Sequence, residues 1–181
     1  MRDRENKKTY RVCFVAHPDD DALWFGNCEL MFGFDIKIYL TYKPSDGRGR
    51  EAISWSLAAC NYCSLVFLEF ADDIVTSTDN ILDALKEEGI PSDVCELYTH
   101  NKHGEDWHHQ HIAVHNAAMR YFKARRVIVP TYNHESVDVS IRFSVTGRKS
   151  DLFRRSFPSQ FEHLARRLPR HVEIDYLDVL F

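Results

Sequence analysis

The chain of 181 residues has no long apolar run and no excess of charge of one sign. No stretch approaches the roughly 18 consecutive apolar residues that a membrane-spanning helix needs. The charged segment 1–8 lacks the apolar core of a signal peptide. Because the formal net charge is only −4, general attraction to polyanions is not expected, and no nucleic-acid partner is predicted. These absences predict a cytoplasmic protein without a membrane span.

Cysteine and glycine motifs are also scarce. The five cysteines are odd in number and lie mostly in apolar segments, so reduced thiols are the simplest account. Cys60 and Cys63 have the spacing of a redox or metal motif, but there is no second pair to complete a zinc knuckle. Gly47-Arg-Gly49 is an isolated turn, and the full glycine fingerprints of phosphate-binding loops are absent. We therefore assign no redox or phosphate-loop function to these residues.

Hydrophobic residues make up 44% of the chain, which is ample for the core of a single domain over 1–181. Short apolar runs alternate with segments of helical apolar spacing. Strands are predicted over 10–16, 35–42, 64–70, 93–99, 126–131 and 172–181, helices over 19–32, 51–63, 79–88, 109–123, 149–157 and 160–168, and a loop over 43–50. This alternation predicts an α/β protein with a mostly parallel sheet and helices on both faces.

The segment 14–24 joins an apolar run to an abrupt polar end, His17-Pro18-Asp19-Asp20-Asp21. Proline disfavours helical backbone for the residue before it, so His17 is expected to stay extended at a strand end. Pro18 and the carboxylates then suit the start of a helix. Because ligands of open α/β sheets bind at the carboxyl ends of strands, one imidazole and several carboxylates are predicted there. Taken alone, the segment is equally typical of an acidic surface turn.

A second cluster spans 100–115 and contains six of the ten histidines. Histidine and carboxylate together are the ligands of zinc and its first-row neighbours. On a helix, His108 and His111 share a face, as do His111 and His115, whereas His109 points elsewhere. The first and fourth strands of such a sheet can be neighbours, so the two clusters are predicted to meet. Spacing alone leaves open whether His108 or His115 joins His111.

These residues resemble a known family. The motif at 17–21 resembles the His-Pro-Asp-Asp-Glu signature of the LmbE/PIG-L family of zinc-dependent de-N-acetylases. Thr99-His-Asn…Gly104-Glu105…His108-His-Gln-His111 resembles the family's second motif, and Val137-Asp-Val-Ser140…Lys149…Phe157-Pro-Ser159-Gln160 is similar to a weaker third segment. The resemblance spans about residues 10–160. It implies a Rossmann-like three-layer fold and removal of an acetyl group from an N-acetylated sugar or sugar conjugate.

Roles follow from the resemblance position by position. His17, Asp20 and His111 match the metal ligands, for Zn²⁺ or for Fe²⁺ or another divalent metal. Asp19 matches the general base, and His108 matches a histidine that acts electrostatically or as a proton donor. The metal site is expected at the carboxyl ends of the strands.

Two positions depart from the family pattern, and one is ambiguous. Asp21 stands where glutamate is usual, and Trp107 stands where glycine is frequent. Trp107 is expected to reshape the mouth of the site or to offer an aromatic face to a sugar ring. The family's substrate-contacting arginine corresponds to Arg48 or Arg50.

Other interpretations remain open at this point. One is an amidase for a non-sugar or nucleotide-linked N-acyl compound, and another is a non-catalytic metal-binding or assembly module of the same fold. The basic segment 142–170 is typical of a solvated helix face, or it receives a phosphorylated substrate. A homo-oligomer is also left open. Of the other histidines, His115 is expected on the helix surface or in packing, and His100, His103 and His109 in a loop or at a rim.

Overall fold

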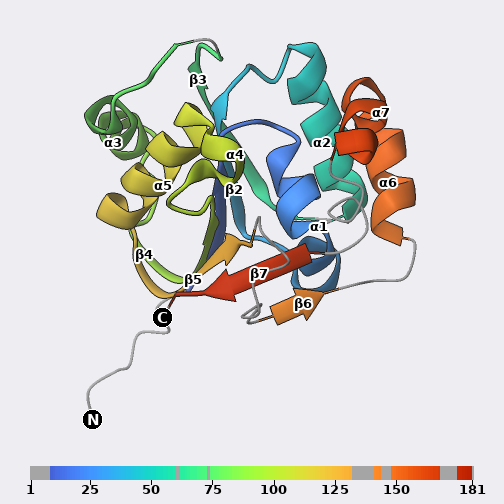
Figure 1. Ribbon diagram of the computed structural model, residues 1–181. Helices are drawn as coiled ribbons and strands as arrows, with labels where there is room; N and C mark the ends of the chain where they lie inside the picture. Colours follow the sequence, from blue (N-terminus) through green and yellow to red (C-terminus); the bar gives the residue numbers. More distant parts are fainter. Residues whose placement is uncertain are drawn as a thin grey trace.

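The sheet at the centre of the structure contains seven strands in the order β3-β2-β1-β4-β5-β7-β6 (Figure 1). The computed structural model describes residues 9–59, 62–72, 74–131, 141–143, 148–167 and 175–180. The strands are β1 (Arg11–Val15), β2 (Ile36–Thr41), β3 (Ser64–Phe70), β4 (Asp93–Thr99), β5 (Lys123–Pro130), β6 (Ile141–Phe143) and β7 (Asp175–Val179). The first five are mutually parallel, whereas β7 is antiparallel to both β5 and β6. The mostly parallel sheet that the sequence predicts is confirmed.

Helices cover both faces of this sheet. They are α1 (Asp20–Phe32), α2 (Gly47–Ala59), α3 (Thr78–Glu87), α4 (Gly104–Trp107), α5 (His109–Tyr121), α6 (Arg148–Ser156) and α7 (Pro158–Arg167). In Figure 1, α3 and α5 lie on one side of the sheet, and α1, α2, α6 and α7 lie on the other. None of the helices in the described ranges is long and apolar enough to cross a membrane.

Side chains of β1 alternate between two cores. Val12 and Phe14 pack in the core shared with α3 and α5, whereas Cys13 and Val15 pack in the core shared with α1, α2, α6 and α7. Because both faces of the sheet are covered, this strand is apolar from Val12 to Val15, as is typical of buried parallel strands. The α/β, Rossmann-like three-layer fold is therefore confirmed.

Several predicted boundaries are wrong. The segment 43–50 is not a loop throughout, because α2 begins at Gly47. A Cβ on Gly49 would collide with the carbonyl oxygen of Lys43, so this glycine permits a close approach of two backbone segments. The last predicted helix begins at Pro158 instead of 160, and the first helical position suits the fixed φ of proline.

The ends of other helices and strands differ from the predicted ones by a few residues. The fifth strand begins at Lys123 instead of 126, the helix before it ends at Tyr121, and the short strand β6 is not predicted from the sequence. The helix predicted over 51–63 ends at Ala59. Cys60 of the cysteine pair lies outside the described residues.

The order of the strands brings the two polar clusters together. β1 pairs with β4, and Phe14 lies opposite Thr99. The segments that follow these two strands, 16–21 and 100–111, therefore meet at the carboxyl edge of the sheet, as the sequence predicts.

Candidate active site

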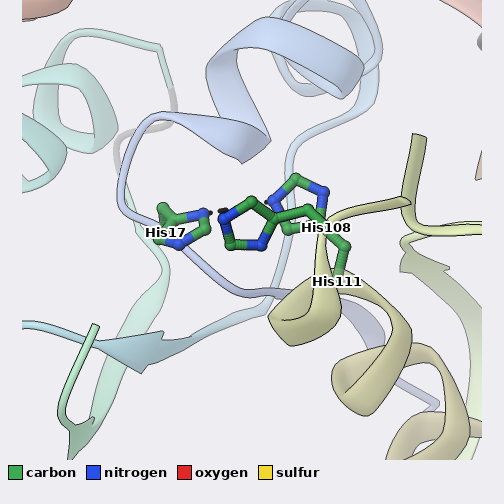
Figure 2. A group of neighbouring side chains, drawn as sticks. All are labelled: His17, His108 and His111. Atoms are coloured by element: carbon green, nitrogen blue, oxygen red, sulfur yellow. Dashed lines mark hydrogen bonds between the residues drawn. The ribbon is translucent and has the colours of Figure 1, made fainter. Parts of the chain in front are cut away.

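Three histidines from the two motifs converge in one cavity of about 370 Å³ (Figure 2). His17 follows β1, and His108 and His111 lie at the start of α5. The ring centroids are 4.9 Å apart for His17 and His108, 5.1 Å for His17 and His111, and 4.6 Å for His108 and His111. His115 is not part of this group. Of the two histidines that helical spacing places beside His111, it is therefore His108 that joins it.

Three acceptor atoms face one another at the centre of the site. Oδ2 of Asp20 lies 3.1 Å from Nδ1 of His17 and 3.4 Å from Nε2 of His111. The two nitrogens are 3.2 Å apart, the contact drawn as a dashed line in Figure 2. Tetrahedral zinc with bonds of about 2.0–2.1 Å to nitrogen separates its ligand atoms by about 3.3–3.4 Å. The spacing of the three atoms therefore fits a metal ion held among them.

Neighbouring carboxylates determine which nitrogen of each ring is free for a metal. Nδ1 of His111 lies 2.7 Å from Glu105, and Nε2 of His17 lies 2.9 Å from Asp72. In the neutral rings these nitrogens carry the hydrogen, which leaves lone pairs on the two facing nitrogens. Two lone pairs and a carboxylate oxygen at such short distances favour a positive charge among them, which either a proton or a metal ion can supply.

The charges around His17 agree with this preference. Burial acts to lower the pKa of His17, but the carboxylates of Asp20 and Asp72 outweigh it and raise the pKa to about 10. The hydrogen bond from His17 is in turn the main cause that lowers the pKa of Asp72. The cavity therefore favours positive charge next to Asp20, and a metal ion must displace protons to bind there.

Glu105 supports the site from behind. Its Oε2 lies 2.7 Å from Nδ1 of both His100 and His111, whose rings are stacked with centroids 3.8 Å apart. The backbone N–H of Ala16 donates to Nε2 of His100 at 3.0 Å. The same nitrogen lies 3.3 Å from Oδ2 of Asp20, so His100 contacts the cluster directly, and Asp20, His100 and His111 form a second group that could hold a metal ion.

His100 lies outside helix and strand directly after β4, as one of its two expectations has it, but it does not lie at a rim, since its exposed fraction is 0%. His103 and His109 are exposed, as expected. His115 is buried, and its Nδ1 lies 2.7 Å from the carbonyl oxygen of His100. His115 thus has a packing role, which is one of the two expected from the sequence.

Asp19 is buried at the start of α1 and forms an ion pair with Arg48. Burial raises the pKa of Asp19, and the guanidinium of Arg48 opposes that shift. Arg48 lies in the first turn of α2 and lines the cavity. Arg50 instead is exposed and donates to the carbonyl oxygen of Ser45. Of the two arginines that the resemblance leaves open, only Arg48 reaches the site.

His108 presents a neutral ring to the cavity. Burial and the neighbouring rings of His111 and His17 lower its pKa to about 4. Its Nδ1 is buried without a hydrogen-bond partner in the described part of the chain. A ring of this kind can exchange a hydrogen bond with a bound molecule.

Two sequence-predicted features lie elsewhere. Trp107 is 74% exposed and lines a second cavity of about 540 Å³, not the cavity of the histidine cluster. Asp21 points into the interior, where its Oδ2 lies 2.7 Å from Nζ of Lys37 and 2.9 Å from the hydroxyl of Tyr39. Asp21, which replaces the usual glutamate, is therefore part of a buried ion pair with Lys37 and does not line the cavity.

The third segment of the resemblance is mainly structural. Lys149 is fully buried and bonds to Asp175 at 2.5 Å and to the carbonyl oxygen of Leu23 at 2.6 Å. Ser159 donates to Glu51 at 2.7 Å. Residues 137–140 of this segment lie outside the described residues.

Part of the cavity wall is not assigned from the sequence. It consists of Asp72, after β3, and of His163, Leu164 and Arg167 on α7. Gln160 of the third motif segment and Leu23 and Trp24 of the segment 14–24 also line the cavity. The spacing of the four α7 residues, at i, i+3, i+4 and i+7, is a helical stripe that was available in the sequence. Asp72 offered no such signal, because only the fold brings it beside His17.

No family model and no curated protein matches the chain. Its structure is similar to N,N'-diacetylchitobiose deacetylase from Pyrococcus horikoshii, with 14% identity, a TM-score of 0.64, and 93% of this chain and 82% of that chain covered. It is also similar to a triple mutant of a deacetylase of the teicoplanin biosynthetic pathway, with 16% identity, a TM-score of 0.57 and coverages of 93% and 98%. A third similar structure is GalB, the 4-carboxy-2-hydroxymuconate hydratase from Pseudomonas putida KT2440, with 11% identity, a TM-score of 0.60 and coverages of 96% and 97%. The chain thus has the fold of two deacetylases, in agreement with its resemblance to the LmbE/PIG-L de-N-acetylases.

Proposed function

We propose that the protein is a zinc-dependent hydrolase that removes the acetyl group from an N-acetylated sugar or sugar conjugate. The observation that carries this proposal is the set of three facing acceptor atoms of His17, Asp20 and His111 at the wall of a cavity. Asp19 and His108 line the same cavity, and the fold is that of two deacetylases.

A metal ion held by these three ligands would lower the pKa of a bound water and polarise the amide carbonyl. Asp19, adjacent in sequence to the ligand Asp20, accepts the proton of the attacking water. Arg48 holds the carboxylate of Asp19 in the cavity. His108 donates a hydrogen bond to the oxygen on which negative charge develops. The leaving amine then takes its proton from Asp19, which received one from the water, or from His108 once that ring has itself bound a proton.

A second candidate has the same site and a different substrate, a nucleotide-linked or non-sugar N-acyl compound. His163 and Arg167 of α7 line the cavity and offer cationic or hydrogen-bonding groups to such a substrate. The fold does not choose between reactions, since the hydratase GalB shares it. We therefore base the reaction type on the residues of the cavity.

The first test is metal content together with amine release. We expect about one metal ion per chain and turnover of N-acetylglucosamine or of its nucleotide- or lipid-linked forms. Chelation should abolish amine release, and added Zn²⁺ should restore it. Metal binding without turnover on these compounds, but with turnover on non-sugar N-acyl amides, would select the second candidate. A protein that binds no metal under replete conditions would contradict both.

Replacement of the two arginines separates their roles. Arg48→Ala is expected to lower kcat/KM by about 10- to 100-fold, the equivalent of one hydrogen bond to a charged group. Arg50→Ala is the matched control and should remain within about twofold of wild type, because Arg50 does not line the cavity. Steady-state kinetics of amine release measure both. Equal losses in the two variants would contradict the assignment of Arg48.

A further inference from the structure

The hydroxyl of Tyr42 joins two side chains at the edge of the cavity. It donates to Oδ2 of Asp72 at 2.6 Å and accepts from Nη1 of Arg48 at 3.1 Å. The guanidinium carbon of Arg48 also lies 4.9 Å from the centroid of the Tyr42 ring, within cation–π distance. Tyr42 is therefore held against both neighbours at once.

Asp72 and Arg48 each have a second polar atom that contacts a residue of the candidate active site. Oδ1 of Asp72 lies 2.9 Å from Nε2 of His17. Nη2 of Arg48 pairs with Oδ1 of Asp19. A continuous arc of polar contacts therefore runs around the cavity in the order His17, Asp72, Tyr42, Arg48 and Asp19.

The backbone at Tyr42 is unusual in the same place. Tyr42 follows β2 directly, and its φ is 67°, in the left-handed region that tyrosine rarely adopts. Such a conformation is strained and persists only where surrounding contacts fix it. The two hydrogen bonds and the ring contact are contacts of this kind.

We propose that Tyr42 is a positioning residue that holds Asp72 against the metal ligand His17 and Arg48 against Asp19. This inference rests on the proposed function, because it assumes that His17 binds a metal ion. Asp72 has a side chain that is 42% exposed and comes from the loop after β3. Without the hydroxyl of Tyr42, the carboxylate of Asp72 is free to turn toward solvent, and the guanidinium of Arg48 loses its second anchor.

Loss of the contact between Asp72 and His17 should weaken metal binding only in part. Oε1 of Gln110 also lies 2.8 Å from Nε2 of His17, and Gln110 is itself held by a bond to the carbonyl oxygen of Ala71 at 3.0 Å. One partner of His17 therefore remains when Asp72 moves. The expected change in metal affinity is at the low end for a residue that contacts a metal ligand.

The test is Tyr42→Phe, which removes only the hydroxyl and keeps the ring over Arg48. Loss of a hydrogen-bond partner of a metal ligand costs about 10- to 100-fold in metal affinity, and because Gln110 remains we expect about 10-fold for Asp72→Ala, which removes both carboxylate oxygens. For Tyr42→Phe, one hydrogen bond further from His17, we expect about 3- to 10-fold. In the Asp72→Ala background, Tyr42→Phe should change the Zn²⁺ affinity no further, because the two groups act in series. Competition with a zinc chelator measures the affinity without reference to turnover.

The second readout is the kinetics of the zinc-loaded protein, in which Tyr42→Phe should lower kcat/KM by about tenfold through the loss of one anchor of Arg48. Tyr62→Phe is the matched control, since Tyr62 is 94% exposed and its variant should match wild type in zinc affinity and melting temperature. An unchanged zinc affinity in Tyr42→Phe, or an equal effect of Tyr42→Phe with and without Asp72→Ala, would overturn the inference alone. A wild-type protein that binds no zinc would overturn the proposed function and this inference together.

Discussion

Asp19→Asn is expected to lower kcat by about 10²- to 10⁴-fold, the usual contribution of a general base, while the protein keeps its metal ion. The amide preserves the shape of the side chain and still accepts a hydrogen bond from Arg48. It has no basic oxygen, however, to take the proton of the attacking water. Amine release and metal content, measured on the same preparations, test both halves of the prediction.

The control for this change is Asp83→Asn. Asp83 is exposed on α3, where it pairs with Lys86, and its variant should turn over like wild type. Wild-type turnover in Asp19→Asn would remove Asp19 from the mechanism. Loss of the metal in Asp19→Asn would instead make Asp19 part of the ligand set, with His17 and His111.

Lys37→Met is expected to lower the free energy of unfolding by about 3–5 kcal/mol, the usual cost of leaving a buried charge without its partner. Lys37 is fully buried and lies between the carboxylates of Asp21 and Glu29. Burial raises the pKa of Glu29 to about 7, and Lys37 is the main cause that opposes this shift. Without the ammonium group, one of these carboxylates must be buried uncompensated or bind a proton.

Denaturant unfolding measures this loss as a lower midpoint at an unchanged slope. Lys86→Met is the matched control, because Lys86 is exposed on α3 and should leave the midpoint nearly unchanged. Adding Glu29→Gln to Lys37→Met should recover part of the stability, since one fewer buried carboxylate then lacks a cation. An unchanged midpoint in Lys37→Met would show that the buried cluster does not depend on its lysine.

Some features of the protein are determined by the sequence locally. Apolar runs such as that of β1 and the helical spacing of α5 follow from side-chain periodicity, and Pro18 marks the end of a strand. The alternation of these segments is enough to predict a mostly parallel sheet. It allows the residues after β1 and β4 to meet, because the first and fourth strands of such a sheet can be neighbours, and the pairing of these two strands brings them together. The predicted starts of α2 and α7 were too late. Composition does not distinguish a glycine in a flexible loop from one packed in a helix, nor a proline that ends a helix from one that begins it.

Other features depend on tertiary structure. Helical spacing places both His108 and His115 beside His111, and only the position of His17, after the neighbouring strand β1, selects His108. Arg48 and Arg50 are two residues apart, and only the position of Asp19 shows which one reaches the site. These choices are settled by partners distant along the chain, and a local pattern carries no information about them.

The same reason explains what was missed altogether. Asp72 and Tyr42 belong to no motif, and their role follows only from contacts that the sheet creates between β2, β3 and the loop after β1. The sequence therefore determines which chemical groups reach the carboxyl edge of the sheet. The packing of the strands decides which of these groups touch. Hydrogen bonds and metal ligation need atoms within about 3 Å of each other, and a periodic sequence pattern does not place atoms that closely.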